Sequence, residues 1–252
     1  MFFGHGNPMN AVLQNRYTEG WRLIGMQTSK PKAILSISAH WFVPRTGVTV
    51  STAPRTIHDF GGFPRELYQV QYPAPGDADL ARRVQQMLAP LPVTLDNSWG
   101  LDHGTCSVLR HVYPDADVPV VQLSIDETQA ASFHFEIGRK LAPLRGERVL
   151  IVGSGNLIHN LHAYAWGRHM PDPYDWAVRF ETEVKAMLLA GEYKSLIDYE
   201  KLGPEALLSI PTPDHYLPML YVIATRQQGE IITFPIEGVD GGSISMLTVQ
   251  VG

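Results

Sequence analysis

The chain has a single cysteine, Cys106, among its 252 residues. One cysteine excludes an internal disulfide and a zinc cluster built from cysteines, and it fits a reducing compartment. A metal ion would therefore need histidine and carboxylate side chains as ligands. The sequence contains ten histidines, somewhat more than usual for this length, so their positions matter more than their number.

Long apolar runs and an excess of positive charge are also missing. The longest apolar runs, such as residues 149–152 and 217–224, are far shorter than the roughly 20 residues that cross a bilayer, and no signal-peptide pattern is recognised. Lys and Arg number 20 against 25 Asp and Glu, a formal net charge of −5. This balance argues against nucleic acid and membrane surfaces as partners. We therefore expect a cytoplasmic protein that acts on a small molecule, with its oligomeric state left open.

The hydrophobic pattern predicts alternating strands and helices in a chain that is 44% hydrophobic. Short segments rich in branched residues predict strands, and apolar residues three and four positions apart predict helices. The predicted strands are 33–38, 48–51, 118–124, 148–152, 231–234 and 244–249, and the predicted helices are 77–88, 133–144, 174–190 and 215–227. The alternation predicts one domain over residues 1–252 with an α/β fold, a three-layer α/β/α sandwich around a mostly parallel or mixed sheet. Residues 53–75, rich in Pro, Gly and aromatics, predict a long loop that shapes a binding site.

Four histidines fall where predicted strands end or a helix begins. His5 follows an apolar start, His40 ends the strand in SISAHWF, His159 closes the glycine turn in IVGSGNLIH, and His215 in PTPDHYLP precedes the last long helix. Ligands of open α/β sheets bind beyond the carboxyl ends of the strands. Imidazoles that converge there from separate segments are typical of catalytic sites for Zn, Fe, Cu or Ni. A helix following His159 or His215 would also disfavour the charged form of the ring.

Each of these residues also has a simpler interpretation. A single histidine is more often a core or turn residue bonded to a backbone carbonyl, and His103 in GLDHGT could be a turn histidine bonded to Asp102. The GSGN stretch is a weak dinucleotide-binding signal, because Ile158 replaces the third glycine and no acidic residue follows at the required distance. We interpret it as a sharp turn that brings His159 into the site.

The remaining candidates concern the walls of the pocket and the outer histidines. His58, Phe60 and Phe63 could wall a pocket against a flat ring. Trp41, next to His40, is expected to point to the opposite face of the sheet and pack a helix against it. The other histidines are interpreted as surface or helix residues: His111, His134, His162 and His169.

Several stretches taken together resemble a known family. They are GHGNPMN, SAHWF, TIHDFGGFP, LDHGT, VQLSID, GSGNLIHN, PTPDHYLPMLYV and GSISMLTVQVG. In the same order along nearly the whole chain, they resemble the DOPA 4,5-dioxygenase extradiol family, within the protocatechuate 4,5-dioxygenase β-subunit superfamily. The resemblance implies a three-layer α/β fold and one non-haem metal ion.

The resemblance also implies roles for individual histidines. His5, His40 and His215 are similar to the family's metal ligands. His159 is similar to its acid/base histidine, and could be a fourth ligand when zinc is bound. His103 is similar to a histidine near the substrate oxygens. Relatives usually carry several more residues before the first histidine, so we expect a short first strand or a shortened chain.

The implied activity is extradiol cleavage of a catechol such as L-DOPA with O₂, giving a muconic semialdehyde. Fe(II) is expected for ring cleavage, but Zn(II) is a competitor, because three neutral histidines replace the two histidines and one carboxylate common in Fe(II) oxygenases. One alternative is a zinc-dependent hydrolase or lyase in which His159 deprotonates a zinc-bound water. Another is a non-catalytic binding protein on the same fold. The physiological catechol is left open.

Overall fold

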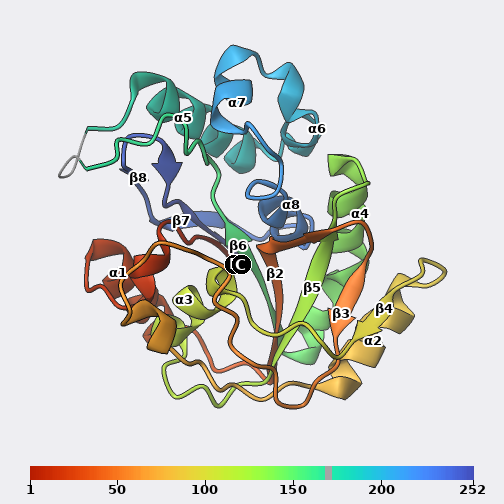
Figure 1. Ribbon diagram of the computed structural model, residues 1–252. Helices are drawn as coiled ribbons and strands as arrows, with labels where there is room; N and C mark the ends of the chain where they lie inside the picture. Colours follow the sequence, from red (N-terminus) through yellow and green to blue (C-terminus); the bar gives the residue numbers. More distant parts are fainter. Residues whose placement is uncertain (168–171) are drawn as a thin grey trace.

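A mixed eight-stranded sheet runs through the middle of the computed structural model, which describes residues 1–167 and 172–252 (Figure 1). The strand order is β4-β3-β5-β2-β6-β1-β10-β7. The strands are β1 (Phe2–Gly4), β2 (Ala33–Val43), β3 (Gly47–Thr49), β4 (Thr94–Asp96), β5 (Val120–Asp126), β6 (Val149–Gly155), β7 (Ile232–Ile236) and β10 (Thr248–Val251), with β8 (Val239–Asp240) and β9 (Ile244–Ser245) paired separately. The four central strands β5, β2, β6 and β1 are mutually parallel. Their carboxyl ends therefore meet at one edge.

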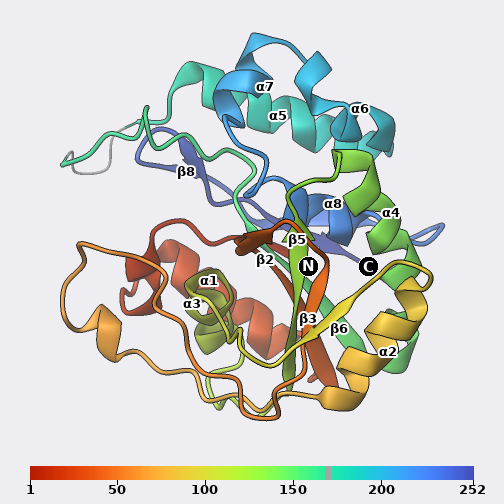
Figure 2. The same cartoon turned by 45° about the vertical axis from the view of Figure 1, so that its right-hand side comes forward.

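Helices cover both faces of this sheet (Figure 2). On one side lie α1 (Arg16–Gln27) and α3 (His103–Val112), and we call this side the α3 face. The other side, the α8 face, carries α2 (Ala78–Leu88), α4 (Ala131–Leu141) and α8 (Leu217–Ile223). The helices α5 (Asp175–Ala190), α6 (Tyr193–Ile197) and α7 (Pro204–Ser209) form a group above α8 and α4 in both views. Among the described residues, four short 3₁₀ helices cover Pro8–Ala11, Leu67–Gln69, Ala142–Glu147 and Tyr199–Lys201. The expected α/β fold with helices on both sides of a mixed sheet is confirmed.

The residues of β2 alternate between the two faces. Leu35 and Ile37 belong to the apolar cluster that also contains the side chains of α8. Ser36 and Ser38 point the other way, where their hydroxyls bond to Thr105 and Asp102 at the start of α3. This period of two is the ordinary pleat of a strand. As a result, one face of the sheet is apolar at the site end and the other is polar.

All six predicted strands are present, with shifted ends. The largest shift is in β2, which does not stop at His40 but runs to Val43, with a register irregularity against β5 between Ile37 and Phe42. His40 lies inside this irregular stretch, which lets its side chain leave the regular ladder. The segment 244–249 is split between β9 and β10.

Four helices, α1, α3, α6 and α7, and the short strands β4 and β8 were not predicted. Both α1 and α3 contain residues of low helix propensity: α1 has two glycines and α3 has Gly, Thr, Ser and Val in its first two turns. Each is stabilised at its start by a side-chain cap, Asn15 for α1 and Asp102 for α3. β4 has only three residues, too few for a periodic pattern. The predicted helix 215–227 is real but shorter, because α8 ends at Ile223.

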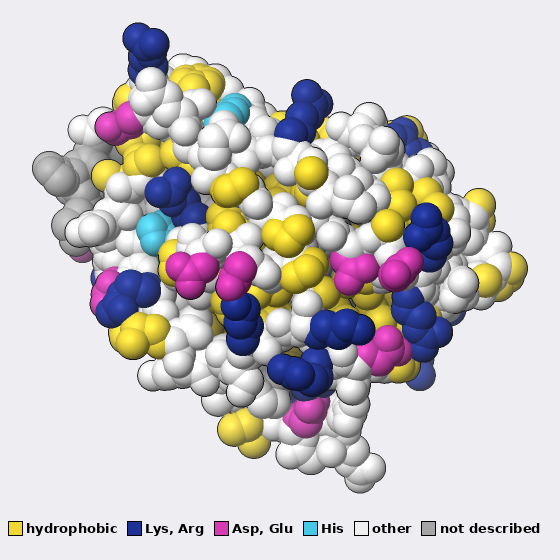
Figure 3. All heavy atoms as spheres, turned by 90° about the horizontal axis from the view of Figure 1, so that it is seen from below, with side chains coloured by type: hydrophobic (Ala, Val, Ile, Leu, Met, Phe, Trp, Pro, Cys, Tyr) yellow, Lys and Arg dark blue, Asp and Glu magenta, His cyan; other side chains and the backbone are white. Residues whose placement is uncertain are grey.

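The surface adds two observations. Among the residues that the structure describes, no helix is both long enough and apolar enough to cross a membrane. On the face shown in Figure 3, basic and acidic side chains lie interspersed.

Candidate metal centre

Five histidines converge at the carboxyl edge of the central strands. His5 directly follows β1, His40 lies in the last part of β2, and His103 is the first residue of α3. His159 comes four residues after β6, and His215 two residues before α8. Contacts between their rings join all five into one cluster. The same five histidines were the candidate site residues in the sequence, and the structure places them together.

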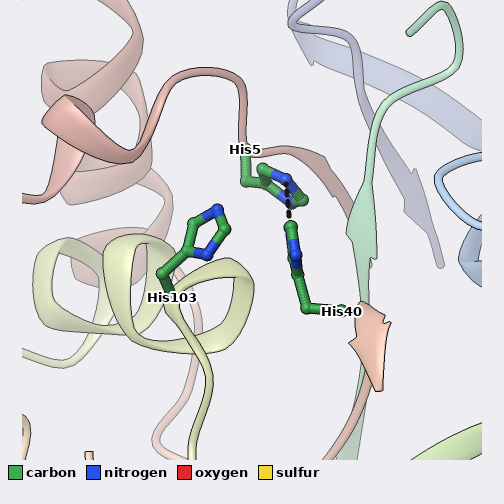
Figure 4. A group of neighbouring side chains, drawn as sticks. All are labelled: His5, His40 and His103. Atoms are coloured by element: carbon green, nitrogen blue, oxygen red, sulfur yellow. Dashed lines mark hydrogen bonds between the residues drawn. The ribbon is translucent and has the colours of Figure 1, made fainter. Parts of the chain in front are cut away.

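His5, His40 and His103 form one candidate metal site (Figure 4). Each offers a ring nitrogen, and these atoms all lie within 4.8 Å of one another. The Nε2 atoms of His5 and His40 are 3.2 Å apart. Two nitrogen ligands held about 2 Å from one ion lie about 3 Å apart, so this pair fits a bound metal. His159, Asp214 and His215 form a second group that meets the same criterion.

Ring positions distinguish the histidines further. The ring centroids of His5, His40 and His215 lie 5.0, 5.2 and 5.2 Å apart, a nearly equilateral triangle. Imidazoles that point at one ion have centroids about 4.5 to 5.2 Å apart for angles between about 90° and 110° at the metal. The centroids of His40 and His103 are closer, at 3.9 Å.

His159 lies flat against His215. Their ring centroids are 3.5 Å apart and the rings are tilted by only 4°. A ligand nitrogen directs its lone pair in the plane of its ring. Because the two planes are stacked, an ion in the plane of one ring lies outside the plane of the other. In this arrangement the two residues do not both point at one ion, and the role of His159 as a fourth ligand stays a prediction.

Asp59, from the long loop before η2 (Leu67–Gln69), contacts two of the histidines. Its Oδ2 lies 3.2 Å from His40 Nδ1 and 3.0 Å from His103 Nδ1, and its Oδ1 accepts a hydrogen bond from the His103 backbone at 2.9 Å. Although burial opposes ionisation, the contacts with His103 and His40 hold the pKa of Asp59 well below its usual range. Burial likewise opposes protonation of His40, but Asp59, Asp102 and Asp214 raise its pKa.

The other two members of the triangle also have outer partners. His5 Nδ1 lies 3.0 Å from Ser154 Oγ, and His215 Nδ1 lies 2.5 Å from Asp214 Oδ2. Partners of this kind fix the orientation of metal-binding histidines. Sequence reasoning did not assign a role at the metal site to Asp59, Asp214 or Ser154. The signal available for the two carboxylates was only their position beside His58 and His215.

Burial disfavours the charged form of three of the clustered histidines, His5, His159 and His215. Burial, reinforced by His40 and other neighbouring histidines, lowers the pKa of His5 well below its usual value. Burial lowers the pKa of His215 to about 4, although Asp214 opposes the shift. Burial and then His215 lower the pKa of His159 to about 2. Neutral imidazoles have a free lone pair, which is the form that binds a metal.

A cavity of about 330 Å³ opens onto the cluster, a size that suits a small ligand. All five histidines line it, together with Phe63 and, from the segment after His159, Leu161, Tyr164 and Trp166. Phe60 lies behind this wall, with its ring 5.6 Å from His103 and 5.5 Å from Phe63. His58 bonds to the carbonyl of Val70 at 2.9 Å. Among the described residues, Phe63 therefore lines the cavity, whereas Phe60 and His58 do not.

The local setting of two predicted residues differs from expectation. His103 is the first residue of α3 and not a turn residue. No helix begins near His159, since the described residues 156–167 form turns and a β-bridge to Ile244. Trp41 is buried but stacks on Trp99, with centroids 5.4 Å apart, and Trp99 belongs to a loop. Its predicted packing against a helix stays a prediction.

The outer histidines are mostly where they were expected. His111 is in α3 and His162 is exposed in a turn, while His169 lies outside the described residues. His134 is in α4 but completely buried, with its Nδ1 2.8 Å from the hydroxyl of Tyr221. Its interpretation as a helix residue is confirmed.

The glycine turn after β6 has a structural explanation. A Cβ on Gly155 would lie 2.1 Å from the carbonyl oxygen of His215. That carbonyl accepts a hydrogen bond from the backbone of Asn156 at 3.0 Å. Glycine is therefore needed so that the segment carrying His215 can approach the end of β6.

Comparisons with known proteins identify the family of this chain. A family model described as the catalytic LigB subunit of aromatic ring-opening dioxygenase matches residues 8–234. The 4,5-DOPA dioxygenase extradiol of Escherichia coli strain K12 is 51% identical over 257 residues, which cover 100% of this chain and 94% of that protein. The protein of the same name from Beta vulgaris is 37% identical over 251 residues, covering 97% and 92%.

A solved structure gives the same result in three dimensions. The crystal structure of the uncharacterized protein JW3007 from Escherichia coli K12 matches with a TM-score of 0.87 and 47% sequence identity. The match covers 100% of this chain and 98% of that one. The motifs, the fold and the histidine cluster lead to one assignment: the chain belongs to the LigB family of extradiol, aromatic ring-opening dioxygenases.

Proposed function

We propose that this protein cleaves the ring of a catechol such as L-DOPA with O₂, giving a muconic semialdehyde. The observation that carries the proposal is the cluster of five histidines lining one cavity at the carboxyl edge of the sheet. Two relatives named 4,5-DOPA dioxygenase extradiol, which match almost the whole chain, support the choice of catechol. In this reaction the ring bond beside the two hydroxyls breaks, and both atoms of O₂ enter the product.

The metal ligands in this proposal are His5, His40 and His215. Their ring centroids form the nearly equilateral triangle, and the Nδ1 atom of each faces an outer partner, which leaves Nε2 for the metal. Fe(II) is the expected metal, because it can supply the redox chemistry that ring cleavage with O₂ requires, whereas Zn(II) cannot. Zn(II) remains a competitor for the site because the ligand set is neutral.

The other two histidines act on protons and oxygen atoms of the substrate. His159 lines the cavity, and burial and then His215 favour its neutral form. It would accept the proton of a catechol hydroxyl whose pKa a bound metal ion has lowered. His103 is backed by Asp59 at 3.0 Å, so its other nitrogen can donate to a substrate oxygen once the ring is protonated. Phe63 supplies an apolar wall for the flat ring.

Oxygen uptake tests the activity. The protein is stripped of metal without air, reloaded with either Fe(II) or Zn(II), and mixed with L-DOPA and other catechols. We expect uptake and a yellow ring-opened product with Fe(II) only, and a loss of about 100-fold or more in His159→Ala. His162→Ala is the matched control, because His162 is exposed and outside the cluster. If no catechol gives uptake with Fe(II), the dioxygenase proposal fails, and zinc-dependent hydrolysis becomes the next activity to test.

Metal affinity tests the ligand set. His215→Ala and His103→Ala are titrated with Zn(II) in competition with a coloured chelator, again beside His162→Ala. We expect His215→Ala to lose tight binding and His103→Ala to keep most of it. The reverse order would replace the proposed set with His5, His40 and His103.

A further inference from the structure

Ser154, near the end of β6, connects helix α3 to His5. Its side chain is completely buried. The Ser154 Oγ atom lies 2.6 Å from the carbonyl oxygen of Gly104 and 3.0 Å from Nδ1 of His5. It therefore has two polar neighbours, one on the helix and one on the imidazole.

The chemistry of these two neighbours fixes the direction of both hydrogen bonds. A carbonyl oxygen can only accept, and a serine hydroxyl has one proton. The proton of Ser154 must therefore point at Gly104, so Ser154 can only accept from His5. We propose that Ser154 is a positioning residue that holds His5 in the tautomer with a proton on Nδ1 and a free lone pair on Nε2. This lone pair is on the atom that lies 3.2 Å from His40 Nε2.

The carbonyl of Gly104 is held in place by its surroundings. A Cβ on Gly104 would lie 2.6 Å from Ser38 Oγ and 2.9 Å from Cδ2 of His40, so only glycine lets α3 come this close to the sheet. Asp102 caps the same helix and accepts a hydrogen bond from Ser38 at 2.7 Å. The acceptor that takes the proton of Ser154 is therefore part of a rigid contact between the helix and the sheet.

The consequence for metal binding rests on the proposed function, because it requires His5 to be a ligand. Outer partners of ligand histidines typically change metal affinity by about 10- to 100-fold. Without Ser154, the His5 ring could place its proton on either nitrogen, and only one of these forms binds the metal through Nε2. The tautomer itself does not depend on any assumption about function.

Nitrogen NMR of the metal-free wild-type protein tests the tautomer directly. The protein is labelled with ¹⁵N-histidine, and His5→Gln identifies the signals of His5. We expect the proton on Nδ1 in the wild-type protein. A proton on Nε2 would overturn the proposal, and this result needs no Ser154 variant to fold.

Metal affinity tests the consequence. Ser154→Ala and Ser36→Ala are compared, because both serines are completely buried in central strands, but the hydroxyl of Ser36 bonds to Thr105 and not to a histidine. We expect Zn(II) binding to weaken about 10- to 100-fold in Ser154→Ala and to stay close to wild type in Ser36→Ala. Equal affinities in the two variants would contradict a positioning role.

His5→Ala separates the two proposals. If His5→Ala binds Zn(II) as tightly as the wild-type protein, the proposed ligand set is wrong. The NMR result on the tautomer would still decide the assignment of Ser154.

Discussion

The two faces of the sheet are built from different chemistry at the same strands. On the α3 face, Ser38 and Ser154 bond to Asp102 and to the carbonyl of Gly104. On the α8 face, Leu35 and Ile37 join an apolar cluster with the residues of α8. Apolar contacts are strong in sum but have no preferred direction, whereas hydrogen bonds fix orientation. The comparison suggests a division of tasks: the α8 face stabilises the fold and the α3 face orients the ligands.

Asp102 illustrates how strongly the α3 face is connected. It is completely buried, and one carboxylate oxygen accepts from Ser38 and from the Thr105 backbone at 2.7 and 3.0 Å. The other oxygen accepts from the side chain of Gln122 on β5. A buried carboxylate is costly unless such bonds satisfy it. Its position at the start of α3 fixes the helix that carries His103.

The largest expected effect is from His40→Ala, which removes a proposed ligand from the α3 face. Activity should fall by more than the roughly 100-fold expected for loss of an outer partner. Because the His40 side chain is partly exposed and outside the apolar cluster, the free energy of unfolding without metal should change by less than about 1 kcal/mol. Oxygen uptake and urea unfolding measure the two quantities. A large loss of stability would contradict the division between the faces.

Leu35→Ala is the opposite experiment on the α8 face. Leu35 is completely buried, so the truncation should lower the free energy of unfolding by about 2 to 5 kcal/mol. Zn(II) affinity of the folded protein should stay near the wild-type value, because Leu35 points away from the histidines. Urea unfolding and chelator competition report on each. A tenfold drop in affinity, with the protein still folded, would show that the apolar face also orients ligands.

Asp59→Asn should have an intermediate effect on the α3 face. The substitution keeps the shape of the side chain but removes the charge that faces His40 and His103. We expect Zn(II) affinity to fall by about 10- to 100-fold, as for other outer partners of ligand histidines. Asp115→Asn is the control, because Asp115 is exposed. Equal binding by the two variants would show that Asp59 is not needed to orient the rings.

The sequence predicted the positions of the histidines better than their surroundings. His5, His40 and His159 could be found because each lies near the end of an apolar run, and His215 because it precedes a helix. Strand periodicity is a local property, so six strands were found. Their order in the sheet was not predictable from one sequence, because pairing depends on contacts between distant segments.

The partners of the histidines depend on those distant contacts. Ser154 meets His5 across 149 positions, and Asp59 meets the His103 backbone across 44. Helix α3 was missed because its stability comes from the Asp102 cap and from packing, while its own residues favour other structures. The stack of Trp41 on Trp99 was not predictable, because it joins two segments with no shared pattern.

The smallest expected effect concerns His134, a polar residue on the α8 face. Burial lowers its pKa from 6.5 to about 4, so the folded protein keeps this ring neutral where the unfolded chain already binds a proton. This difference has no effect above about pH 6.5, and it lowers the free energy of unfolding as the pH falls towards 4, by about 2 kcal/mol at pH 5. Urea unfolding of the metal-free protein at pH 7.5 and 5 measures this loss.

His134→Gln isolates the contribution of this residue from those of the clustered histidines, which are present in both proteins. Glutamine can still bond to the hydroxyl of Tyr221, the partner of His134 at 2.8 Å, but it does not titrate. The stability of the variant should therefore fall less than that of the wild-type protein between pH 7.5 and 5. Identical pH dependence would mean that His134 gains a proton in the folded state without cost. In that case the α8 face would be less strictly apolar around α4 than its packing indicates, and the contrast between the two faces would be limited to the strands next to the metal site.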